Sequence, residues 1–493
     1  MTTIVAIDAG TTGIRSLAVS ERGEVIGISY RELTQHFPRP GWVEHDAAEI
    51  FSLVEETLAE LAGRLGEAGE TVAAIGMTNQ RETAVAWDLT TGEPLQPAIV
   101  WQDRRTADRC RELEEAGHGE LVRTRTGLVL DSYFSATKWQ WMFEHGGLEP
   151  SSSLALGTID DWVGWKLTGR HATDVTNASR TLCFDLGTSS WSEELCELFG
   201  IEMAFLGEVV ASSGRLGAVR REVAGGRLAD VPLSGVAGDQ QADLFGQGCT
   251  TAGMTKVTYG TGSFVLMNVG AEVPDPVDGL VTTVAWQIGE DRAATAYALE
   301  GSVFSSGSTI QWLRDGLGLI EEAAEIGPLA ESVPTSGGIY IVPAFVGLGS
   351  PWWDPSARGV IGGLTKGVGR AELARAVVEA MAFQVRDVLD AMVAGSGCEL
   401  ETIRVDGGAS ALDLLCRLQA DQSRVSVVRP ATTEVTALGA AFLAGVAEGV
   451  WHLEELASLA GEEARFEPAV SAARADVDHR LWLRALEVSR RLA

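Results

Sequence analysis

Four short segments of the sequence combine polar side chains with tight turns and could act on phosphate or hydroxyl groups. The first, DAGTTGIR, spans residues 8–15. Its two glycines permit a tight turn whose N–H groups can point at phosphate oxygens, and its two threonines add hydroxyl donors. Arg15 supplies a positive charge, and Asp8 is a candidate Mg²⁺ ligand. An ordinary hairpin with a glycine turn is the alternative interpretation.

A second segment places a carboxylate after an Ala-Gly turn, at Asp239, followed by Gln240 and an apolar helical pattern. A carboxylate in this position can accept a proton from a substrate hydroxyl, which is general-base chemistry. Aspartate is also a favoured N-cap residue, so a purely structural helix cap is the alternative.

The third segment, TNQRET, contains the adjacent pair Arg81 and Glu82 directly after an apolar strand pattern. A neighbouring donor and acceptor suit the adjacent hydroxyls of a small polyol, whereas a surface ion pair is the plainer interpretation. Trp101 and Tyr133 would ordinarily be core aromatics. The fourth segment, VDGGAS at residues 405–410, lets a nucleotide approach the backbone closely, although generic strand-to-helix turns look similar.

The patterns around these segments predict an α/β fold. The first thirty residues alternate apolar strands with glycine-containing turns, and a helical pattern follows at about 47–65. Further strands are expected at 72–77 and near 83–87, and a small-residue helix at 435–446 is expected to be buried.

A strand, a Gly/Thr turn and a second strand recur at residues 256–269. A chain of 493 residues also exceeds the ~250–300 residues at which one core stops growing. We therefore expect two domains of similar plan that face each other across a cleft. The boundary is expected near residue 248, which gives domains of residues 1–248 and 249–493.

Bulk composition limits the classes of function. With 45% hydrophobic and 22% charged residues, the chain has an ordinary globular composition. It contains no apolar run of the roughly 18 residues that span a bilayer, and its first residues enter a strand pattern without a signal-peptide pattern. We expect a cytoplasmic protein without membrane insertion. The six scattered cysteines predict free thiols, and the seven histidines do not cluster at metal-ligand spacing.

The formal net charge of -30 argues against a nucleic-acid or anionic-membrane partner. A polyanionic substrate such as ATP would have to be met locally, by backbone N–H groups, a few arginines and a metal ion.

Taken together and in this order, the four segments resemble the FGGY carbohydrate kinases, and among them the glycerol kinases. The resemblance runs from Asp8 to the helix after Gly408. It includes two long family stretches, at residues 133–145 and at 359–364 followed by 372–379. The resemblance implies two actin-like, ribonuclease H-like domains that enclose a nucleotide and substrate cleft. It also implies ATP-dependent phosphorylation of glycerol to sn-glycerol 3-phosphate, with ATP and Mg²⁺.

The resemblance assigns roles by position. The residues that it implies for glycerol binding are Arg81, Glu82, Trp101, Tyr133, Asp239, Gln240 and Phe264, with Asp239 as the catalytic proton acceptor. The residues that it implies for nucleotide binding are Thr11, Thr12, Gly13, Arg15, Thr261, Gly307, Gln311, Gly408 and Leu412, and the metal residue is Asp8. All seven glycerol positions carry the family's residue types.

Two nucleotide positions depart from the family pattern. Ala9 stands where glycerol kinases usually carry Gln, and Leu412 stands where an Asn usually meets the adenine. Asp413, next to Leu412, is an alternative partner for the base. In the segment where some relatives bind fructose bisphosphate or are phosphorylated on a histidine, this chain has Asp230 at the Arg place and no histidine, so neither control is expected.

Two alternative functions and one expected oligomeric state follow from the same observations. The nearest alternative is an FGGY kinase for another small polyol or ketose, such as erythritol, dihydroxyacetone or xylulose. A more remote one is a non-kinase actin-like ATPase that couples nucleotide state to partner binding. The family resemblance also implies a homodimer or a homotetramer.

Overall fold

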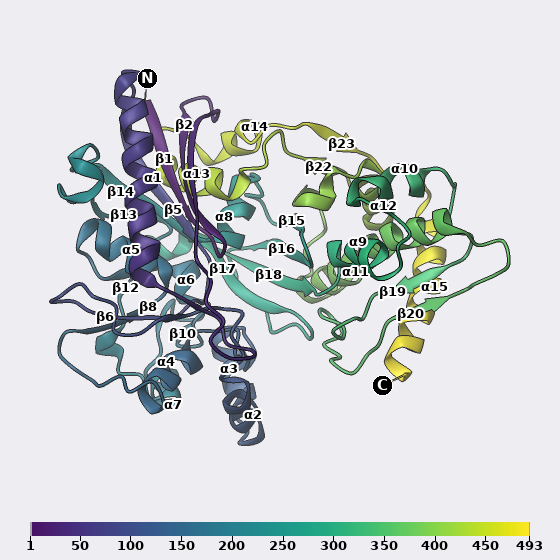
Figure 1. The fold of residues 1–493 in the computed structure, drawn as a ribbon, viewed down its shortest axis with the longest axis horizontal. Helices are drawn as coiled ribbons and strands as arrows, with labels where there is room; N and C mark the ends of the chain where they lie inside the picture. The colour runs from purple at the N-terminus through teal and green to yellow at the C-terminus, as the bar shows by residue number, and fades with distance from the viewer. Residues whose placement is uncertain (1, 493) are drawn as a thin grey trace.

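Two mixed β-sheets, each covered by helices, organise the chain (Figure 1). The computed structural model describes residues 2–492. The first sheet has the order β13-β14-β5-β1-β2-β3. Its strands are β1 (Thr2–Ala9), β2 (Gly13–Ser20), β3 (Val25–Glu32), β5 (Thr71–Asn79), β13 (Ser213–Ala218) and β14 (Pro232–Gly238). The pairs β1-β2 and β2-β3 are antiparallel, whereas β5 is parallel to both β1 and β14.

The second sheet repeats this plan in the order β17-β18-β16-β15-β21-β22-β23. Its strands are β15 (Met254–Tyr259), β16 (Ser263–Gly270), β17 (Val281–Gln287), β18 (Thr295–Val303), β21 (Thr402–Asp406), β22 (Val427–Arg429) and β23 (Ala464–Phe466). An antiparallel hairpin, β15-β16, again has a parallel strand, β21, on its other side. The predicted repeat of strand, turn and strand is confirmed.

Helices and short ladders complete the fold. The helices are α1 (Ala47–Glu67), α2 (Ala107–Glu115), α3 (Gly119–Thr126), α4 (Ala136–Glu144), α5 (Ile159–Thr168), α6 (Val175–Ala178), α7 (Glu193–Phe199), α8 (Asp239–Gly246), α9 (Gly307–Gln311), α10 (Ile326–Glu331), α11 (Arg370–Ser396), α12 (Asp413–Ser423), α13 (Val435–Ala447), α14 (Leu456–Leu459) and α15 (Ala472–Arg491). The short strands are β4 (Glu44–His45), β6 (Val85–Asp88), β7 (Ala98–Ile99), β8 (Leu154–Gly157), β9 (Ala172–Asp174), β10 (Phe184–Asp185), β11 (Ser190–Trp191), β12 (Glu208–Val210), β19 (Tyr340–Val342) and β20 (Val360–Gly362).

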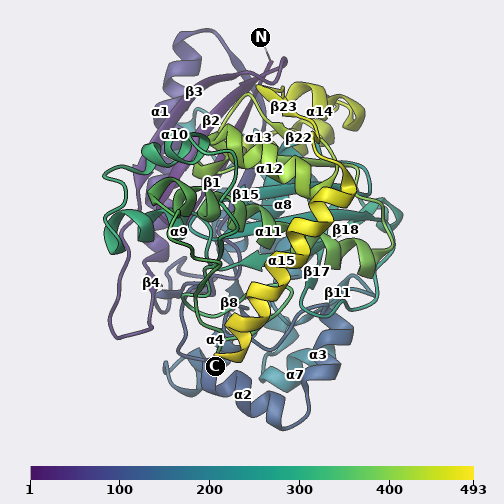
Figure 2. The ribbon, with the colours of Figure 1, turned by 90° about the vertical axis from the view of Figure 1, so that its right-hand side faces the viewer.

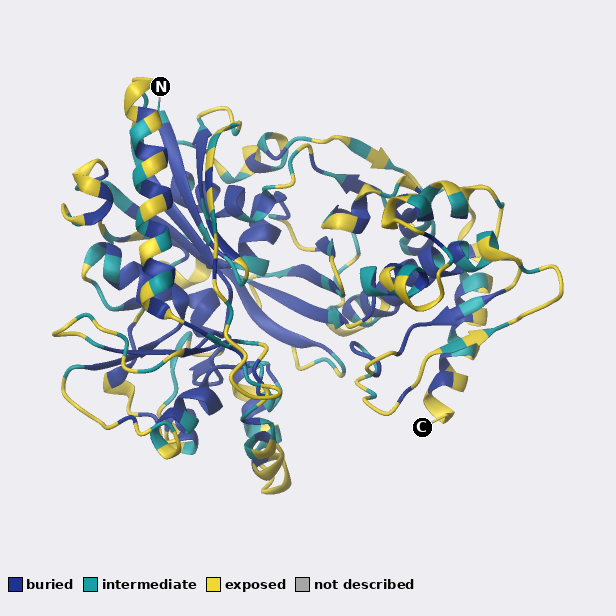
Figure 3. Ribbon diagram, viewed as in Figure 1, coloured by how far each residue is buried: buried dark blue, intermediate teal, exposed yellow. Residues whose placement is uncertain are grey.

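Strand β1 shows why the first sheet is buried on both faces. Because successive side chains of a strand point to opposite faces, Val5 and Ile7 join the core beneath α1 and α5. Ile4 and Ala6 point the other way and pack with α8 and α13. Figure 3 shows the resulting pattern, in which the central strands are buried and the exposed residues lie on loops and outer helix faces.

Helices α8 and α13 form a layer between the two sheets (Figure 1). One continuous core joins them to Ile4 and Ala6 of the first sheet and to Leu266 and Ala298 of the second. Helix α13 belongs to the C-terminal half by sequence, yet it packs on β1, β5 and β14. The two halves of the chain therefore share this layer rather than meeting only at a surface.

The helix layer depends on close backbone approach. A Cβ at Gly439 of α13 would overlap the carbonyl oxygen of Ala242 in α8. A Cβ at Gly76 of β5 would overlap the carbonyl oxygen of Ala440. Only glycine allows both contacts, because neither neighbouring backbone atom can move aside independently.

Helix α15 closes the C-terminal part of the molecule, and Figure 2 shows it running diagonally across that face. Its buried Trp482 donates through Nε1 to Asp387 Oδ2 of α11 at 2.9 Å. His479 Nε2 lies 2.6 Å from the other oxygen of Asp387. The carboxylate thus fastens α15 to α11, far along the chain from the predicted site.

Most of the predicted elements are confirmed. The opening strands, the helix at 47–65 and the buried helix at 435–446 correspond to β1 to β3, α1 and α13. All six cysteines are free. Among residues 2–492, no helix combines the length and apolar character that crossing a membrane requires. The boundary at residue 248 falls in the connection between α8 and β15, and it stays a prediction.

We expect Gly439→Ala to lower the free energy of unfolding by roughly 1–3 kcal/mol, the usual cost of overpacking, despite alanine's better helix propensity. Urea unfolding of the variant measures this. The matched control is Gly63→Ala in α1, where an added Cβ meets nothing within 4 Å. That variant should be as stable as the parent or gain up to ~1 kcal/mol. Equal stabilities for both variants would contradict the close-approach argument.

Candidate active site

The carboxyl ends of three parallel strands bring the first candidate residues together. Ala9 of β1 is in register with Asn79 of β5, and Asn79 with Gly238 of β14. The residues that follow β5 and β14, Arg81 and Asp239, therefore emerge at the same sheet edge as the turn after β1. In α/β sheets this edge is where ligands bind.

Arg81 is the best-connected side chain of the site, and it is almost fully buried. Its Nη1 and Nη2 donate to the two carboxylate oxygens of Glu300 at 2.7 and 3.0 Å. Nη2 also donates to the hydroxyl of Tyr133 at 3.2 Å. Its Nε lies 3.4 Å from Oδ1 of Asp239. The guanidinium is thus held in one orientation beside the candidate base.

Glu82 is also buried, and its backbone has a φ of 57°, in the left-handed region that a non-glycine residue rarely adopts. Its carbonyl oxygen accepts hydrogen bonds from Ser135 Oγ at 3.1 Å and Lys138 Nζ at 3.2 Å. Its carboxylate accepts one from Arg180 Nε at 2.7 Å. Strained backbone of this kind persists only where surrounding contacts hold it, and it is common at ligand sites.

Lys138 holds the backbone around Glu82 and Tyr133. Besides Glu82, its ammonium donates to the carbonyl oxygens of Tyr133 at 2.6 Å and Phe134 at 3.2 Å. Burial lowers the pKa of Lys138 to about 8, and the neighbouring carboxylates oppose that shift. One side chain therefore fixes the backbone of both candidate polyol ligands on this side of the site.

Asp239 is the first residue of α8, and Gly238 is the N-cap, so Asp239 is not the helix cap. Its side chain is 32% exposed. Burial of the carboxyl raises the pKa of Asp239 to about 6, against the opposing effect of Arg81. A carboxylate with a pKa of about 6 is a stronger base than an ordinary aspartate and is still ionised at neutral pH.

Gln240 faces the second sheet. Its side-chain carbonyl accepts a hydrogen bond from the buried Lys256, which leaves its amide N–H groups to donate elsewhere. Lys256 Nζ also donates to Asp243 Oδ2 and to Thr258 Oγ1, both at 2.9 Å. The lysine thereby ties α8 to strand β15.

Two of the three aromatic candidates, Trp101 and Tyr133, form one wall. Trp101 and Tyr133 pack edge to face with their ring centroids 5.5 Å apart, and Trp101 Nε1 donates to Thr11 Oγ1 at 3.0 Å. Phe264 lies on β16 directly opposite Ser302. Residues that pair across antiparallel strands share a face, so Phe264 lies on the same face of the second sheet as Glu300.

Two further turns lie at the carboxyl edge of the second sheet. Thr258 near the end of β15 pairs with Asp406 at the end of β21, which brings the 260–262 turn beside Gly407 and Gly408. The N–H of Gly307, which begins α9, donates to Gly260 O at 2.9 Å. An added Cβ at Gly408 would meet no atom within 4 Å, so a ligand can approach this backbone.

Leu412 precedes α12 and packs against the core of the second half rather than pointing a polar group outward. The neighbouring Asp413 accepts a hydrogen bond from Arg429 Nη1 at 3.0 Å. Gln311 ends α9. Among residues 2–492, no hydrogen bond or ion pair joins Leu412, Asp413 or Gln311 to Arg81 or to its bonding partners.

Asp8 is the candidate metal residue. Burial raises the pKa of Asp8 to about 7; Arg15 opposes this shift, and the Asp239 carboxylate adds to it. The Arg15 Nε lies 3.7 Å away, and Arg15 also forms an ion pair with Glu434 across the two halves. A further cation would stabilise the ionised form of Asp8. Across the described residues no three His, Cys, Asp or Glu side chains converge to hold a metal. The single carboxylate of Asp8 fits Mg²⁺, which is commonly held by one or two carboxylates together with substrate phosphates and water.

Five buried charged residues at or beside the site escaped the sequence interpretation: Lys138, Arg180, Asp243, Lys256 and Glu300. Lys256 and Glu300 interrupt apolar strand patterns, at TKVTY and YALEG. The available signal was a charged residue inside such a strand, because a charged side chain is almost never buried without a partner.

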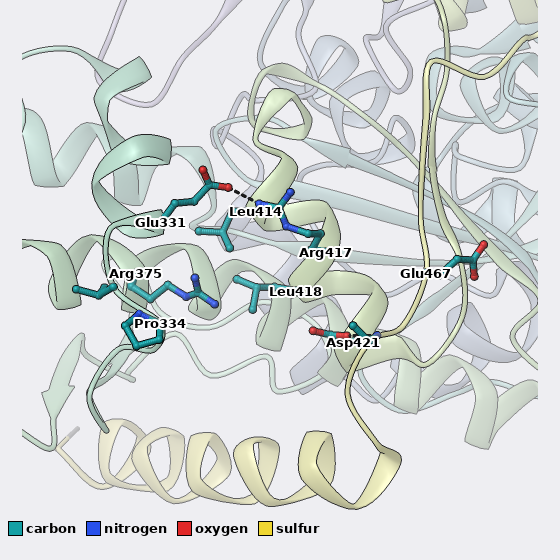
Figure 4. Close-up of a pocket in the computed structure, with 10 residues that line it drawn as sticks. Glu331, Pro334, Arg375, Leu414, Arg417, Leu418, Asp421 and Glu467 are labelled. Atoms are coloured by element: carbon teal, nitrogen blue, oxygen red, sulfur yellow. Dashed lines mark hydrogen bonds and ion pairs between the residues drawn. The ribbon is translucent and has the colours of Figure 1, made fainter.

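A separate hollow of about 430 Å³ lies among α10, α11 and α12 (Figure 4). Leu414 and Leu418 line it, and Arg417 forms an ion pair with Glu331 beside it. None of the sequence-predicted site residues lines this hollow.

Comparison with known proteins places this geometry in a family. Residues 3–246 match the N-terminal domain of the FGGY family of carbohydrate kinases, and residues 255–448 match its C-terminal domain. The chain belongs to the FGGY family of carbohydrate kinases.

Similar FGGY proteins are found by sequence and by structure. The chain is 51% identical to the glycerol kinase of Dechloromonas aromatica, over 99% of this chain and 97% of that one. The crystal structure of Plasmodium falciparum glycerol kinase with ADP has a TM-score of 0.94 at 32% identity and covers 99% of this chain and 98% of that one. A xylulose kinase from Lactobacillus acidophilus has a TM-score of 0.89 at 22% identity, with 100% and 98% coverage, and shows the shared fold. The predicted actin-like, two-domain fold is confirmed.

We expect Lys138→Met to lower the free energy of unfolding by roughly 1–3 kcal/mol, because three buried carbonyl groups lose a donor. Denaturant titration measures the change. The control is Lys366→Met, which changes an exposed lysine between β20 and α11. The control should change stability by less than ~0.5 kcal/mol, as is usual at exposed positions. A Lys138 variant as stable as its control would show that these carbonyls do not need the lysine.

Proposed function

We propose that this FGGY kinase phosphorylates glycerol with ATP to give sn-glycerol 3-phosphate. The observation that carries the proposal is the placement of the partly exposed Asp239 next to the buried Arg81 and Glu82, beside the Trp101–Tyr133 wall. It sets donors and acceptors for neighbouring hydroxyls next to a carboxylate whose pKa is raised. The identity to glycerol kinases over nearly the whole chain supports the same substrate.

In this mechanism Asp239 accepts the proton of a terminal glycerol hydroxyl as that oxygen attacks the γ-phosphorus of ATP. The bond from the γ-phosphorus to the bridging oxygen breaks, and ADP leaves. Arg81, Glu82 and the amide of Gln240 orient the triol, and Trp101 and Phe264 line its carbon skeleton. Phosphoryl transfer passes through a loose transition state, so the contribution of these residues is mainly positioning.

The nucleotide side of the proposal uses the two Gly/Thr turns. The backbone N–H groups near Thr11, Thr12 and Thr261 would cradle the phosphates, and Arg15 would add positive charge. Mg²⁺, held at Asp8 together with ATP phosphates, would neutralise phosphate charge. Closure of the two halves would exclude water and limit ATP hydrolysis. A cytoplasmic location and a homodimer or homotetramer belong to the same proposal.

The deciding experiment is ADP release by purified protein with Mg-ATP, offered glycerol, dihydroxyacetone, erythritol, xylulose or no acceptor. Glycerol-dependent release, with glycerol 3-phosphate identified as product, is the expected result. A preference for another acceptor would keep the mechanism and replace the substrate. Release that needs no acceptor would favour an actin-like ATPase.

We expect Asp239→Asn to fold normally and to reduce kcat by at least ~10², the usual contribution of a general base. Steady-state kinetics with saturating glycerol measure the loss. The control is Asp46→Asn, which changes an exposed aspartate that caps the N-terminus of α1. Near-normal turnover of the Asp239 variant would exclude its role as proton acceptor.

The pH dependence should report the same carboxylate. Because Asp239 accepts a proton only when ionised, kcat/KM for glycerol should be halved near pH 6 and fall about tenfold per pH unit below it. Enzyme held at pH 5 and returned to pH 7.5 should regain full activity, which separates titration from unfolding. The kcat/KM for ATP is measured in parallel, because burial raises the pKa of Asp8 to about 7. A profile that is flat from pH 7 to pH 5 would refute the assignment.

A further inference from the structure

Two buried residues, Arg180 and Glu300, stand directly behind the proposed glycerol ligands. Arg180 follows α6, and Glu300 lies in the middle of β18. Their side chains are 0% and 2% exposed. Neither is placed to touch solvent, so their charges must be balanced by neighbouring protein groups.

The two residues complete a closed set of four charges with Arg81 and Glu82. Glu300 accepts both Nη groups of Arg81, and its Oε1 also accepts from Arg180 Nη2 at 3.1 Å. Arg180 Nε in turn donates to Glu82 at 2.7 Å. Two guanidiniums and two carboxylates thus alternate. Burial alone would raise the pKa of Glu300, but Arg180 and Arg81 lower it to about 2.

This set also crosses between the halves of the chain. Glu300 belongs to the second sheet, where it pairs in register with Leu266 of β16 and Val281 of β17. The β17-β18 hairpin reaches beside the first half: the N–H of Thr282 donates to Gly127 O at 2.9 Å, and Ser179 Oγ lies 3.0 Å from Thr283 Oγ1. A C-terminal strand therefore holds an N-terminal glycerol ligand.

The geometry restricts what Arg81 can do. An unheld guanidinium has many rotamers and would form a bidentate pair with any nearby carboxylate, including Asp239. With both Nη groups on Glu300, Arg81 meets Asp239 only through Nε, at 3.4 Å. Three other charged groups interact with the Asp239 carboxylate: Glu82 raises its pKa, Lys256 lowers it, and Asp8 repels it. The carboxylate thus keeps an accessible oxygen.

We propose that Glu300 and Arg180 are positioning residues that set the selectivity of the glycerol site, by fixing Arg81 and Glu82 at the spacing of two neighbouring hydroxyl groups. This inference rests on the proposed function. It predicts that loss of either residue damages recognition of a vicinal diol more than it damages the use of ATP.

The experiment compares the parent enzyme with Glu300→Gln and Arg180→Lys. Glu300→Gln keeps the shape but loses the charge and one acceptor, and Arg180→Lys keeps the charge but loses the planar fork. Each should raise KM for glycerol at least about tenfold and change KM for ATP less than about threefold. The preference for glycerol over propane-1,3-diol, which lacks the central hydroxyl, should shrink by a similar factor, because the fixed spacing is lost.

Two further variants separate positioning from folding. Asp387→Asn removes a buried carboxylate that fastens α15 to α11, so it should lower stability while leaving the diol preference unchanged. The double change Arg180→Gln with Glu300→Gln removes one charge of each sign. It should recover part of the stability lost in Glu300→Gln but keep the raised KM for glycerol.

The outcomes are distinct. A double variant that recovers both stability and glycerol KM would overturn the proposal and leave the network a purely structural role. Single variants with parental glycerol KM and diol preference would overturn it as well. If the parent enzyme uses another acceptor from the panel, the proposed function fails. The positioning role is then measured with that acceptor and an analogue lacking one hydroxyl, and the same KM comparison decides it.

Discussion

Burying four charges at the junction of two sheets constrains this molecule more than any other interaction. Moving an ion into a protein interior carries an effective penalty of several kcal/mol, which is offset only when the partners and hydrogen bonds are well placed. Here the partners of Arg81 include Glu300 on β18 of the second half and, in the first half, Glu82 after β5 and Tyr133 before α4. The two halves must therefore meet in one arrangement, and the site forms only where they do.

The shared helix layer provides that arrangement. Strand ends are positioned by register, and register is set by the side chains that each strand buries on its two faces. In β1 both faces are apolar, and one of them packs on α8 and α13, which also cover the second sheet. Gly76 and Gly439 let these backbones approach directly. The same layer begins with Asp239, so the candidate base is part of the element that joins the two halves.

Much of the fold could be predicted from the sequence because its signals are local. Alternating apolar residues and glycine turns define β1 to β3, and the small-residue run of α13 indicates a helix buried on all sides. The packing of α13 on the sheet of the other half could not be predicted in this way, because which face a buried helix meets depends on contacts distant in sequence.

In the candidate site, too, local patterns could be predicted, whereas contacts between distant segments could not. Arg81, Glu82 and Asp239 each follow a strand or a turn in a short local motif, and the resemblance to the family predicts their roles from these motifs. Glu300 and Lys256 have no local motif. The partners of Glu300 lie far away in sequence, since Arg81 is 219 residues from it. Lys256 pairs with Asp243, 13 residues away in a different element, α8. What the sequence could show was only that each charge interrupts an apolar strand and so must have a partner.

The opposing effects on Asp239 explain why the set of four charges matters for chemistry. Burial raises the pKa of Asp239, and Arg81 lowers it, with a net value of about 6. A guanidinium free to pair fully with Asp239 would lower the pKa further and make the carboxylate a weaker base; removing the guanidinium would leave the carboxyl protonated at higher pH. Glu300 holds Arg81 close enough to Asp239 to keep that carboxylate ionised. Because both Nη groups of Arg81 are bonded to Glu300, Arg81 does not form a bidentate pair with Asp239. A site that must bind a neutral triol and accept its proton needs both conditions, and the reach of β18 across the two halves supplies them.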